Sequence, residues 1–137
     1  MTSLPPNTWL KDCGTQNPMP FGQYMHHCLY HPQYGYYTQN LPRQGKLGDY
    51  YTAPTLGPLF AHTLALHLAE ILQQHPHWAI GEIGPGQGHL CVELLSALAK
   101  LGIHTRYYCI EPFSHSRQAQ QQLCREALNP DISTNIY

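Results

Sequence analysis

The sequence has little net charge and no long apolar run. Its seven basic and eight acidic residues give a formal net charge of -1, so the charge balance does not favour nucleic acid or an anionic membrane as a partner. The apolar stretches are interrupted by His, Glu and Gln, and residues 1–14 hold no basic region followed by a hydrophobic run. These absences argue against a membrane span and a secretory signal. We expect neither a nucleic-acid nor a membrane partner.

The cysteines lack the arrangement of a disulfide or zinc scaffold. There are five, an odd number, and no two of them form a C-x-x-C pair: Cys13, Cys28, Cys91, Cys109 and Cys124. A reduced, cytosolic protein fits this pattern better than a disulfide-rich protein or a zinc ribbon.

The first half of the chain predicts an irregular arm and one helix. Proline, glycine and asparagine are frequent in residues 1–18 and favour an irregular arm. Apolar residues then recur at helical spacing and predict a helix that ends before Pro32: Phe21, Tyr24, Met25, Cys28 and Leu29. Residues 34–51 are aromatic and glycine-rich, and they fit either an extended or a looped chain.

The second half of the chain alternates between helix and strand patterns. A helix is expected from Pro58, which suits a first helical turn, to a point before Pro76. Its predicted buried stripe is Phe60, Leu64, Leu68, Ile71 and Leu72. Residues 78–83 are expected to form a short buried strand and 106–110 a second strand.

A helix is expected between the two strands and another after them. The first has a predicted apolar face and a glycine stop: Leu90, Leu94, Leu98, Leu101 and then Gly102. The second follows Pro112, with Ser114 as its predicted cap. The order strand, glycine turn, helix, strand, helix predicts a parallel α/β unit.

The turn after the first strand, "GPGQG" at 84–88, has little side chain. Such a turn points amide hydrogens and the positive end of the helix dipole beyond the carboxyl end of the strand. A side chain at Gly84, Gly86 or Gly88 would hold a ligand away or forbid a positive φ. The turn therefore predicts close approach of a ligand with an anionic group.

Two carboxylates accompany this turn. Glu111 ends the second strand, 23 positions after Gly88, close to the spacing at which nucleotide sites place an acid on ribose hydroxyls. Glu82 lies inside the first strand, where a buried carboxylate needs a hydrogen-bond partner or a cation. Taken singly, these features could be a tight turn, an exposed strand end and a carboxylate bonded to the backbone. In the predicted strand-turn-helix-strand order they favour a ligand site.

The pattern differs from two common nucleotide motifs. The glycines alternate at 84, 86 and 88 instead of following G-x-G-x-x-G, and no P-loop lysine is present. A ligand with a ribose, a carboxylate and a positive charge, but no phosphate, suits the turn, Glu82 and Glu111 better. S-adenosylmethionine has these groups.

The same residues resemble those of a known class. "EIGPGQG" followed by "IEP" resembles motif I and the ribose-binding acid of class I S-adenosylmethionine-dependent methyltransferases. "MPFGQYMHHCLYHPQYGYYT" and "GKLGDYYTAPTLGPLFA" resemble the N-terminal signature of the MidA-like / NDUFAF7 family within that class, over residues 21–60. Two departures are Thr55, at a position often acidic in bacterial relatives, and Ala61, where glycine is usual.

This resemblance implies a Rossmann-like, doubly wound α/β fold, incomplete here, and S-adenosyl-L-methionine as cofactor. It implies a protein substrate, with an arginine of a respiratory complex I subunit as acceptor for the mitochondrial relative. It also places the "GDYYTAP" loop beside the cofactor. The candidate cofactor-binding residues are therefore Gly48, Thr52, Glu82, Gly84, Pro85, Gly86, Gly88 and Glu111.

The resemblance makes Asp49 the candidate catalytic acid, although a Gly-Asp pair is also common in turns. An arginine acceptor stays protonated unless carboxylates orient and polarise it. No other upstream acid is proposed.

We divide the chain into an irregular arm (1–18), a helical extension (19–76) and the first βαβα part of the S-adenosylmethionine-binding domain (77–137). Two parallel strands alone leave an uncovered face and unpaired edges, which are a liability in water. We therefore predict the N-terminal part of a larger protein, whose partner is the missing C-terminal part of the same fold, or else an inactive truncated product. The expected location is the cytoplasm in a bacterium and the mitochondrial matrix in a eukaryote.

Other functions stay open at this point. His27 and His31 are spaced i, i+4, but no H-E-x-x-H arrangement accompanies them, so no metal site is expected. A non-catalytic assembly factor would bind S-adenosylmethionine without transferring its methyl group. A nicotinamide-dependent oxidoreductase would bind NAD and not S-adenosylmethionine.

Overall fold

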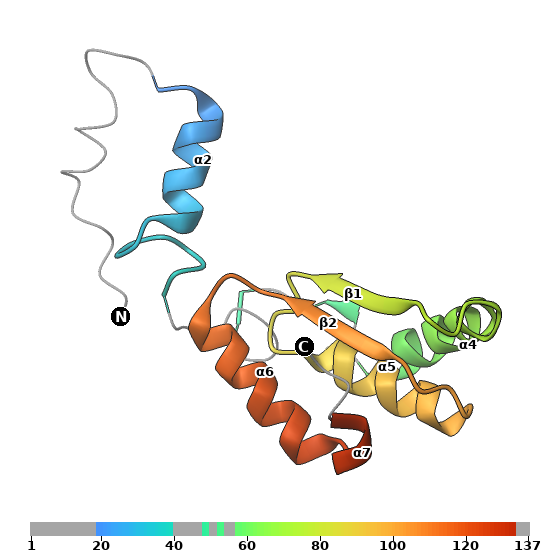
Figure 1. The fold of residues 1–137 in the computed structure, drawn as a ribbon. Helices are drawn as coiled ribbons and strands as arrows, with labels where there is room; N and C mark the ends of the chain where they lie inside the picture. Colours follow the sequence, from blue (N-terminus) through green and yellow to red (C-terminus); the bar gives the residue numbers. More distant parts are fainter. Residues whose placement is uncertain (1–18, 40–47, 50–51, 54–56, 134–137) are drawn as a thin grey trace. The chain divides into compact units, whose positions relative to one another are not determined.

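The computed structural model describes residues 19–39, 48–49, 52–53 and 57–133. The chain divides into two compact units, Met1–Leu41 and Pro42–Tyr137. The first unit contains α2 (Phe21–Tyr30), and the second contains α4 (Leu59–Gln74), β1 (Ala79–Ile83), α5 (His89–Lys100), β2 (Arg106–Ile110), α6 (Ser114–Ala127) and α7 (Pro130–Ser133), as labelled in Figure 1.

Helix α2 confirms the first helix predicted from apolar spacing, and it ends before Pro32. After it the chain turns around His31, whose Nδ1 accepts hydrogen bonds from the amides of Gln33 at 3.2 Å and Tyr34 at 3.3 Å. A Cβ on Gly35 would lie 2.5 Å from the His31 amide nitrogen, so only glycine fits there. The His31 ring therefore has a structural role in this turn.

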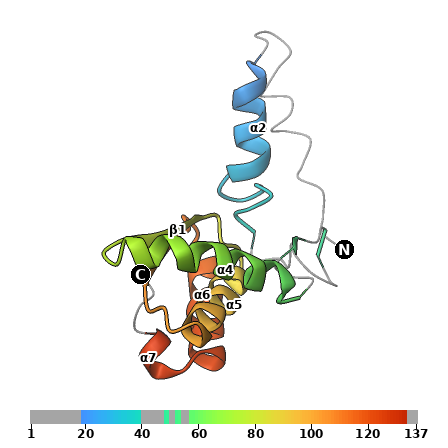
Figure 2. The ribbon, with the colours of Figure 1, turned by 90° about the vertical axis from the view of Figure 1, so that its right-hand side faces the viewer.

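The two strands pair in parallel, with Glu82 opposite Cys109 and Ile83 opposite Ile110. The predicted strand at 106–110 and the parallel pairing are confirmed. Figures 1 and 2 both show α5 and α6 on the same side of this sheet. The carboxyl ends of both strands consequently lie at one edge, where β1 leads into α5 and β2 leads into α6.

The core of the second unit is centred on α5, which contacts α4, α6 and α7. Three of its side chains and Tyr107 of β2 are at most 1% exposed: Cys91, Leu94 and Leu98. Helix α5 ends near Gly102, whose φ of 74° confirms the predicted glycine stop. Leu101 is 42% exposed, so it does not belong to the buried face as predicted, because the helix has already ended at Lys100.

Helix α4 is most deeply buried along a row of mostly small residues beside the predicted stripe. Its buried residues are Ala61, Ala65, Ala69 and Leu72, whereas Phe60 is 44% exposed. Small side chains at i, i+4 and i+8 allow the backbone of α4 to approach its neighbour α5 closely, so the larger residues lie beside the contact. The predicted stripe is thus correct at Leu72, correct in part at Leu64 and Leu68, which are half-buried and pack against the core, and wrong at Phe60.

Strand β1 is not fully buried, contrary to the sequence prediction. Ile80 and Glu82 are half-buried, whereas Ile83 is 84% exposed. Strand β2 alternates in the same way, with Tyr107 buried and Ile110 53% exposed. Among the described elements, helices cover only one face of the sheet, which gives the alternation of a half-buried strand.

The predicted cap of the last helix is also wrong. Ser114 is the first residue of α6, and the capping position is Phe113, which makes no side-chain cap hydrogen bond. The amide of Phe113 instead donates to Oε1 of Glu111 at 3.0 Å. The side chain of Glu111, predicted as a ligand-binding acid or an exposed strand end, therefore also holds the corner before α6.

The described part of the chain contains four cysteines, Cys28, Cys91, Cys109 and Cys124, all with free thiols. Cys13 lies outside the described residues. Within the described ranges, no three His, Cys, Asp or Glu side chains are grouped to hold a metal ion. No helix in these ranges is long and apolar enough to span a membrane.

Candidate functional site

The glycine turn lies at the carboxyl end of β1. Gly84, Gly86 and Gly88 have φ angles of 69°, 58° and 89°, in the left-handed region that residues with a Cβ rarely adopt. The amide of Gly84 donates to the carbonyl of Ile110 at 3.0 Å, and that of Gly88 donates to the carbonyl of Pro85 at 2.9 Å. The backbone path alone therefore requires glycine at these positions.

The turn ends at the N-terminus of α5. Gly88 occupies the capping position of this helix and provides no side chain to cap it. Gly88 and Pro85 are buried, Gly86 is half-buried and Gly84 is exposed. The amides of the first helical turn lack partners within the helix, and they point with the positive end of the helix dipole toward the space beyond the turn. This arrangement suits an anionic group of a ligand.

Glu82, two positions before Gly84, has a hydrogen-bond partner within the chain. The hydroxyl of Tyr107, a residue that is 1% exposed, donates to Oε2 of Glu82 at 2.8 Å. Burial raises the pKa of Glu82, and the hydrogen bond from Tyr107 lowers that pKa in part. Burial and the charge of Glu82 together raise the pKa of Tyr107 far above its usual value. The phenol therefore stays protonated and acts as a donor to the carboxylate.

Glu111 lies beside the glycine turn. The bond between the Gly84 amide and the Ile110 carbonyl joins the two strand ends directly before Glu111. The half-buried carboxylate of Glu111 is held through Oε1 by the amide of Phe113. Nη1 of Arg117 donates to the carbonyls of Glu111 at 2.8 Å and Pro112 at 2.7 Å. The structure thus brings the turn and the acid to one end of the sheet.

Gln120, which is not among the residues predicted from the sequence, also contacts the turn. Its Nε2 donates to the carbonyl of Gly86 at 2.6 Å, and its side chain is only 5% exposed. A Cβ on Gly88 would lie 3.3 Å from Cγ of Gln120. The one available sequence signal is its i, i+4 spacing from Cys124, which places Gln120 on the inward face of α6.

The predicted residues of the upstream loop are less well defined. Gly48 and Thr52 are half-buried and Asp49 is exposed, while residues 50–51, between them, lie outside the described residues. Thr55 also lies outside them. The assignments of Gly48 and Thr52 to the cofactor, and of Asp49 to catalysis, therefore stay predictions.

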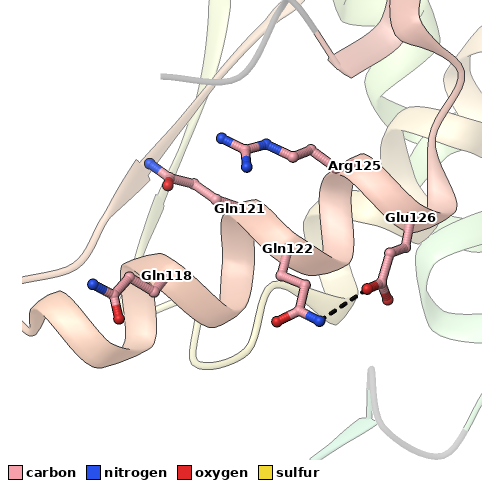
Figure 3. Close-up of a pocket in the computed structure, with 5 residues that line it drawn as sticks. All are labelled: Gln118, Gln121, Gln122, Arg125 and Glu126. Atoms are coloured by element: carbon pink, nitrogen blue, oxygen red, sulfur yellow. Dashed lines mark hydrogen bonds between the residues drawn. The ribbon is translucent and has the colours of Figure 1, made fainter.

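A polar hollow of about 380 Å³ lies on the outer face of α6. Figure 3 shows its lining residues, which all come from this one helix: Gln118, Gln121, Gln122, Arg125 and Glu126. Gln122 donates to Glu126 across one turn at 2.9 Å. Because Gln120 and Cys124 point inward from the same helix, this hollow does not include the residue that contacts the glycine turn.

The fold and the site define a Rossmann-like binding unit, in which a glycine turn and an acid stand at the carboxyl ends of neighbouring parallel strands. Residues 63–137 match the family model of S-adenosyl-L-methionine-dependent methyltransferases named Methyltransf_28. The chain belongs to this family.

Two of the relatives are homologs of a mitochondrial protein arginine methyltransferase. The chain is 35% identical over 89 residues to the Caenorhabditis elegans homolog of protein arginine methyltransferase NDUFAF7, covering 61% of this chain and 21% of the relative. It is 29% identical over 111 residues to the Drosophila melanogaster homolog, covering 76% of this chain and 25% of the relative.

Solved structures from Burkholderia thailandensis share the fold. One of them has S-adenosyl-homocysteine bound and matches with a TM-score of 0.78 and 33% identity, covering 87% of this chain and 32% of that chain. A second, native structure matches with a TM-score of 0.69 and 34% identity, covering 87% and 29%. The chain therefore spans about a fifth to a third of the length of these relatives.

These comparisons confirm the predicted family, the Rossmann-like α/β fold class and the class of cofactor. The division into an arm, a helical extension and a βαβα part stays a prediction. So do the roles of the individual site residues.

Proposed function

We propose that this chain forms the cofactor-binding part of an S-adenosylmethionine-dependent methyltransferase. The observation that carries the proposal is the meeting of the glycine turn and Glu111 at one sheet edge, joined by the bond from Gly84 to Ile110. A bare turn and a carboxylate at neighbouring strand ends suit the two ends of an adenosyl ligand.

Each part of the site has a proposed role toward S-adenosylmethionine. The turn from Gly84 to Gly88, Pro85 included, approaches the amino-acid end of the ligand, and the open amides of α5 receive its carboxylate. Glu111 accepts from the ribose hydroxyls with Oε2, since Oε1 already accepts from Phe113. Glu82 faces the positive end of the ligand, because a cation favours the charged form of a carboxylate whose pKa burial has raised.

The chemistry requires mainly positioning. S-adenosylmethionine supplies a methyl group on a positively charged sulfur, and the chain aligns that methyl group with an acceptor. Alignment of this kind accounts for roughly 7–11 kcal/mol of barrier reduction in favourable intramolecular cases. Gly48 and Thr52 form a further wall of the site, and Asp49 orients the acceptor. The acceptor is an arginine of a protein, as in the name of the NDUFAF7 relatives.

The open face of the sheet supports a second part of the proposal. Ile83 and Ile110 are exposed on the side that the described helices leave uncovered. We propose that the further polypeptide of the same fold covers this face and pairs with the free strand edges. The complete enzyme acts in the bacterial cytoplasm or the mitochondrial matrix, and its activity requires both parts.

Calorimetric titration with S-adenosyl-homocysteine tests the proposed site. We expect saturable binding, and we expect Glu111→Ala to weaken it by about tenfold or more, because hydrogen bonds to a charged group contribute about 1.5–3 kcal/mol. Glu126→Ala on the outer face of α6 is the matched control and should leave binding unchanged. A heat of binding with NAD, and none with S-adenosyl-homocysteine, would favour an oxidoreductase instead.

Transfer of labelled methyl groups then separates an enzyme from a binding-only assembly factor. The chain joined with its completing polypeptide should label an arginine-containing protein acceptor. Saturable binding of S-adenosylmethionine without any transferred label would refute the catalytic part of the proposal and retain the binding site.

A further inference from the structure

Helix α6 contacts both halves of the proposed site, through the buried side chain of Gln120 and the exposed side chain of Arg117. Gln120 bonds to the glycine turn, and Arg117 bonds to the backbone at Glu111. We infer that Gln120 and Arg117 are positioning residues that fix the glycine turn relative to Glu111 and thereby set the affinity for the adenosyl cofactor. This inference rests on the proposed function and assigns two further residues to the same site.

The contact of Gln120 is specific to the turn. A buried amide side chain, 5% exposed, donates over 2.6 Å to the carbonyl of Gly86. Glycines with positive φ alternate along this turn at 84, 86 and 88, and Gln120 supplies one of the restraints on its shape beside the backbone bonds of Gly84 and Gly88. The side chain also lies against Gly88. Loss of the amide would free the turn to adopt other glycine conformations, at an entropic cost to ligand binding.

Arg117 restrains the other half of the site. One guanidinium nitrogen binds the carbonyls of both Glu111 and Pro112, at 2.8 Å and 2.7 Å. These two bonds fix the corner between β2 and α6. Since the corner carries the Glu111 carboxylate, its direction depends on Arg117 as well as on the bond to Phe113.

The two restraints are coupled through one helix. Positions 117 and 120 are spaced i, i+3 and therefore lie on the same side of α6, about 4.5 Å apart along its axis. A rigid helix that touches both the turn and the corner keeps the distance between them constant. The separation of the two ligand-binding halves is thus determined by α6 in addition to the pairing of the strands.

The experiment compares residues of α6 that contact the site with residues of the same type on the same helix that do not. Gln120→Met keeps the side-chain length and removes the amide, and Gln121→Met is its matched control on the outer face (Figure 3). Arg117→Met is paired with Arg125→Met in the same way. Each variant is titrated with S-adenosyl-homocysteine and with adenosine, which lacks the amino-acid end.

The two ligands separate the two roles. Gln120→Met should weaken the binding of S-adenosyl-homocysteine about five- to tenfold and that of adenosine by less than about twofold. Only S-adenosyl-homocysteine has an amino-acid end that reaches the turn. Arg117→Met should weaken the binding of both ligands by about the same factor, since both contain the ribose. Arg117→Lys, which retains the charge but cannot reproduce the paired bonds, should show an intermediate loss.

Urea unfolding of each variant determines the folded fraction, so that affinities refer to folded chains. Gln120→Asn is a second variant whose shorter amide cannot reach Gly86, and it should show the same loss as Gln120→Met. If the wild-type chain binds S-adenosyl-homocysteine and both Gln120 variants bind it equally well, the inference is wrong and the proposed function stands. A wild-type chain that binds neither ligand would overturn both.

Discussion

Replacing Tyr107 with phenylalanine tests the energetic link between the core and Glu82. The substitution removes one hydroxyl group from a side chain that is 1% exposed and leaves the ring in place. The lost hydroxyl is the donor to Oε2 of Glu82 at 2.8 Å. The Glu82 carboxylate then stays half-buried but no longer accepts a hydrogen bond from residue 107.

The expected cost follows from the burial of the two partners. A hydrogen bond to a charged group contributes about 1.5–3 kcal/mol. Because Glu82 is only half-buried, water can replace part of the lost donor, and we expect a decrease of about 1 kcal/mol in the free energy of unfolding at neutral pH. This corresponds to about a fivefold change in the folding equilibrium.

The pH dependence gives this prediction its sign. Burial already raises the pKa of Glu82 above its ordinary value of 4.5, and Tyr107 lowers it in part. In Tyr107→Phe the pKa of Glu82 rises further. A carboxyl group with a raised pKa in the folded state contributes stability below its unfolded pKa and loses that contribution as the pH rises. The difference between wild type and variant should therefore be smaller below about pH 4 and larger above the folded pKa.

Urea unfolding at a series of pH values measures this difference. Tyr108→Phe is the control, since residue 108 lies on the opposite face of β2 from Glu82 and should leave the pH profile unchanged. A free-energy difference for Tyr107→Phe that stays constant from about pH 4 to pH 8 would show that the hydroxyl does not act on an ionisable Glu82.

Other substitutions test the turn, the core, the open sheet face and the charge of Glu82. Gly88→Ala should lower the free energy of unfolding by about 1–2 kcal/mol in urea titrations, since a Cβ at φ 89° is strained and lies 3.3 Å from Gln120; unchanged stability would argue against the left-handed turn. Leu98→Ala, at 0% exposure, should cost about 2–5 kcal/mol by the same method, and a smaller loss would contradict its place in the core. Ile83→Ser, at 84% exposure, should change the stability of the chain alone by less than about 0.5 kcal/mol while weakening its binding to the completing polypeptide in a pull-down titration. Glu82→Gln should raise stability at pH values above the folded-state pKa of Glu82, where the wild-type carboxyl group is charged, and should weaken the binding of S-adenosyl-homocysteine in calorimetry; lower stability in that range would contradict the raised pKa.

Sequence periodicity predicts the elements of this fold better than it predicts which side of them is buried. In α4 the alanines at 61, 65 and 69 and the larger residues at 60, 64 and 68 have the same spacing and differ in phase by one residue. Hydrophobicity favours the larger set, but close approach to α5 selects the smaller one. The phase is decided by the neighbouring helix, which the local sequence does not contain.

The candidate site likewise has features that the sequence order predicts and others that depend on the tertiary structure. The topology of parallel strands places the glycine turn and Glu111 at one sheet edge, and the sequence order is enough to predict this. The donor to Glu82 is 25 positions away on the other strand, so its identity depends on the register of the pairing. Gln120 is one of four glutamines between 118 and 122, and only the inward face of α6 distinguishes it from the others.

The corner at Glu111 explains why a helix placed after the second strand affects the ligand. Its side chain accepts a hydrogen bond from the amide of Phe113, while its carbonyl accepts one from Arg117 in the first turn of α6. A ligand hydroxyl at the remaining oxygen would therefore bind a group whose orientation α6 already determines. Gln120 of the same helix donates a hydrogen bond to the carbonyl of Gly86. A rotation or shift of α6 would therefore move both halves of the site together. Substitutions of Gln120 and Arg117 should consequently change ligand affinity, whereas those around the outer hollow should change neither affinity nor the shape of the turn.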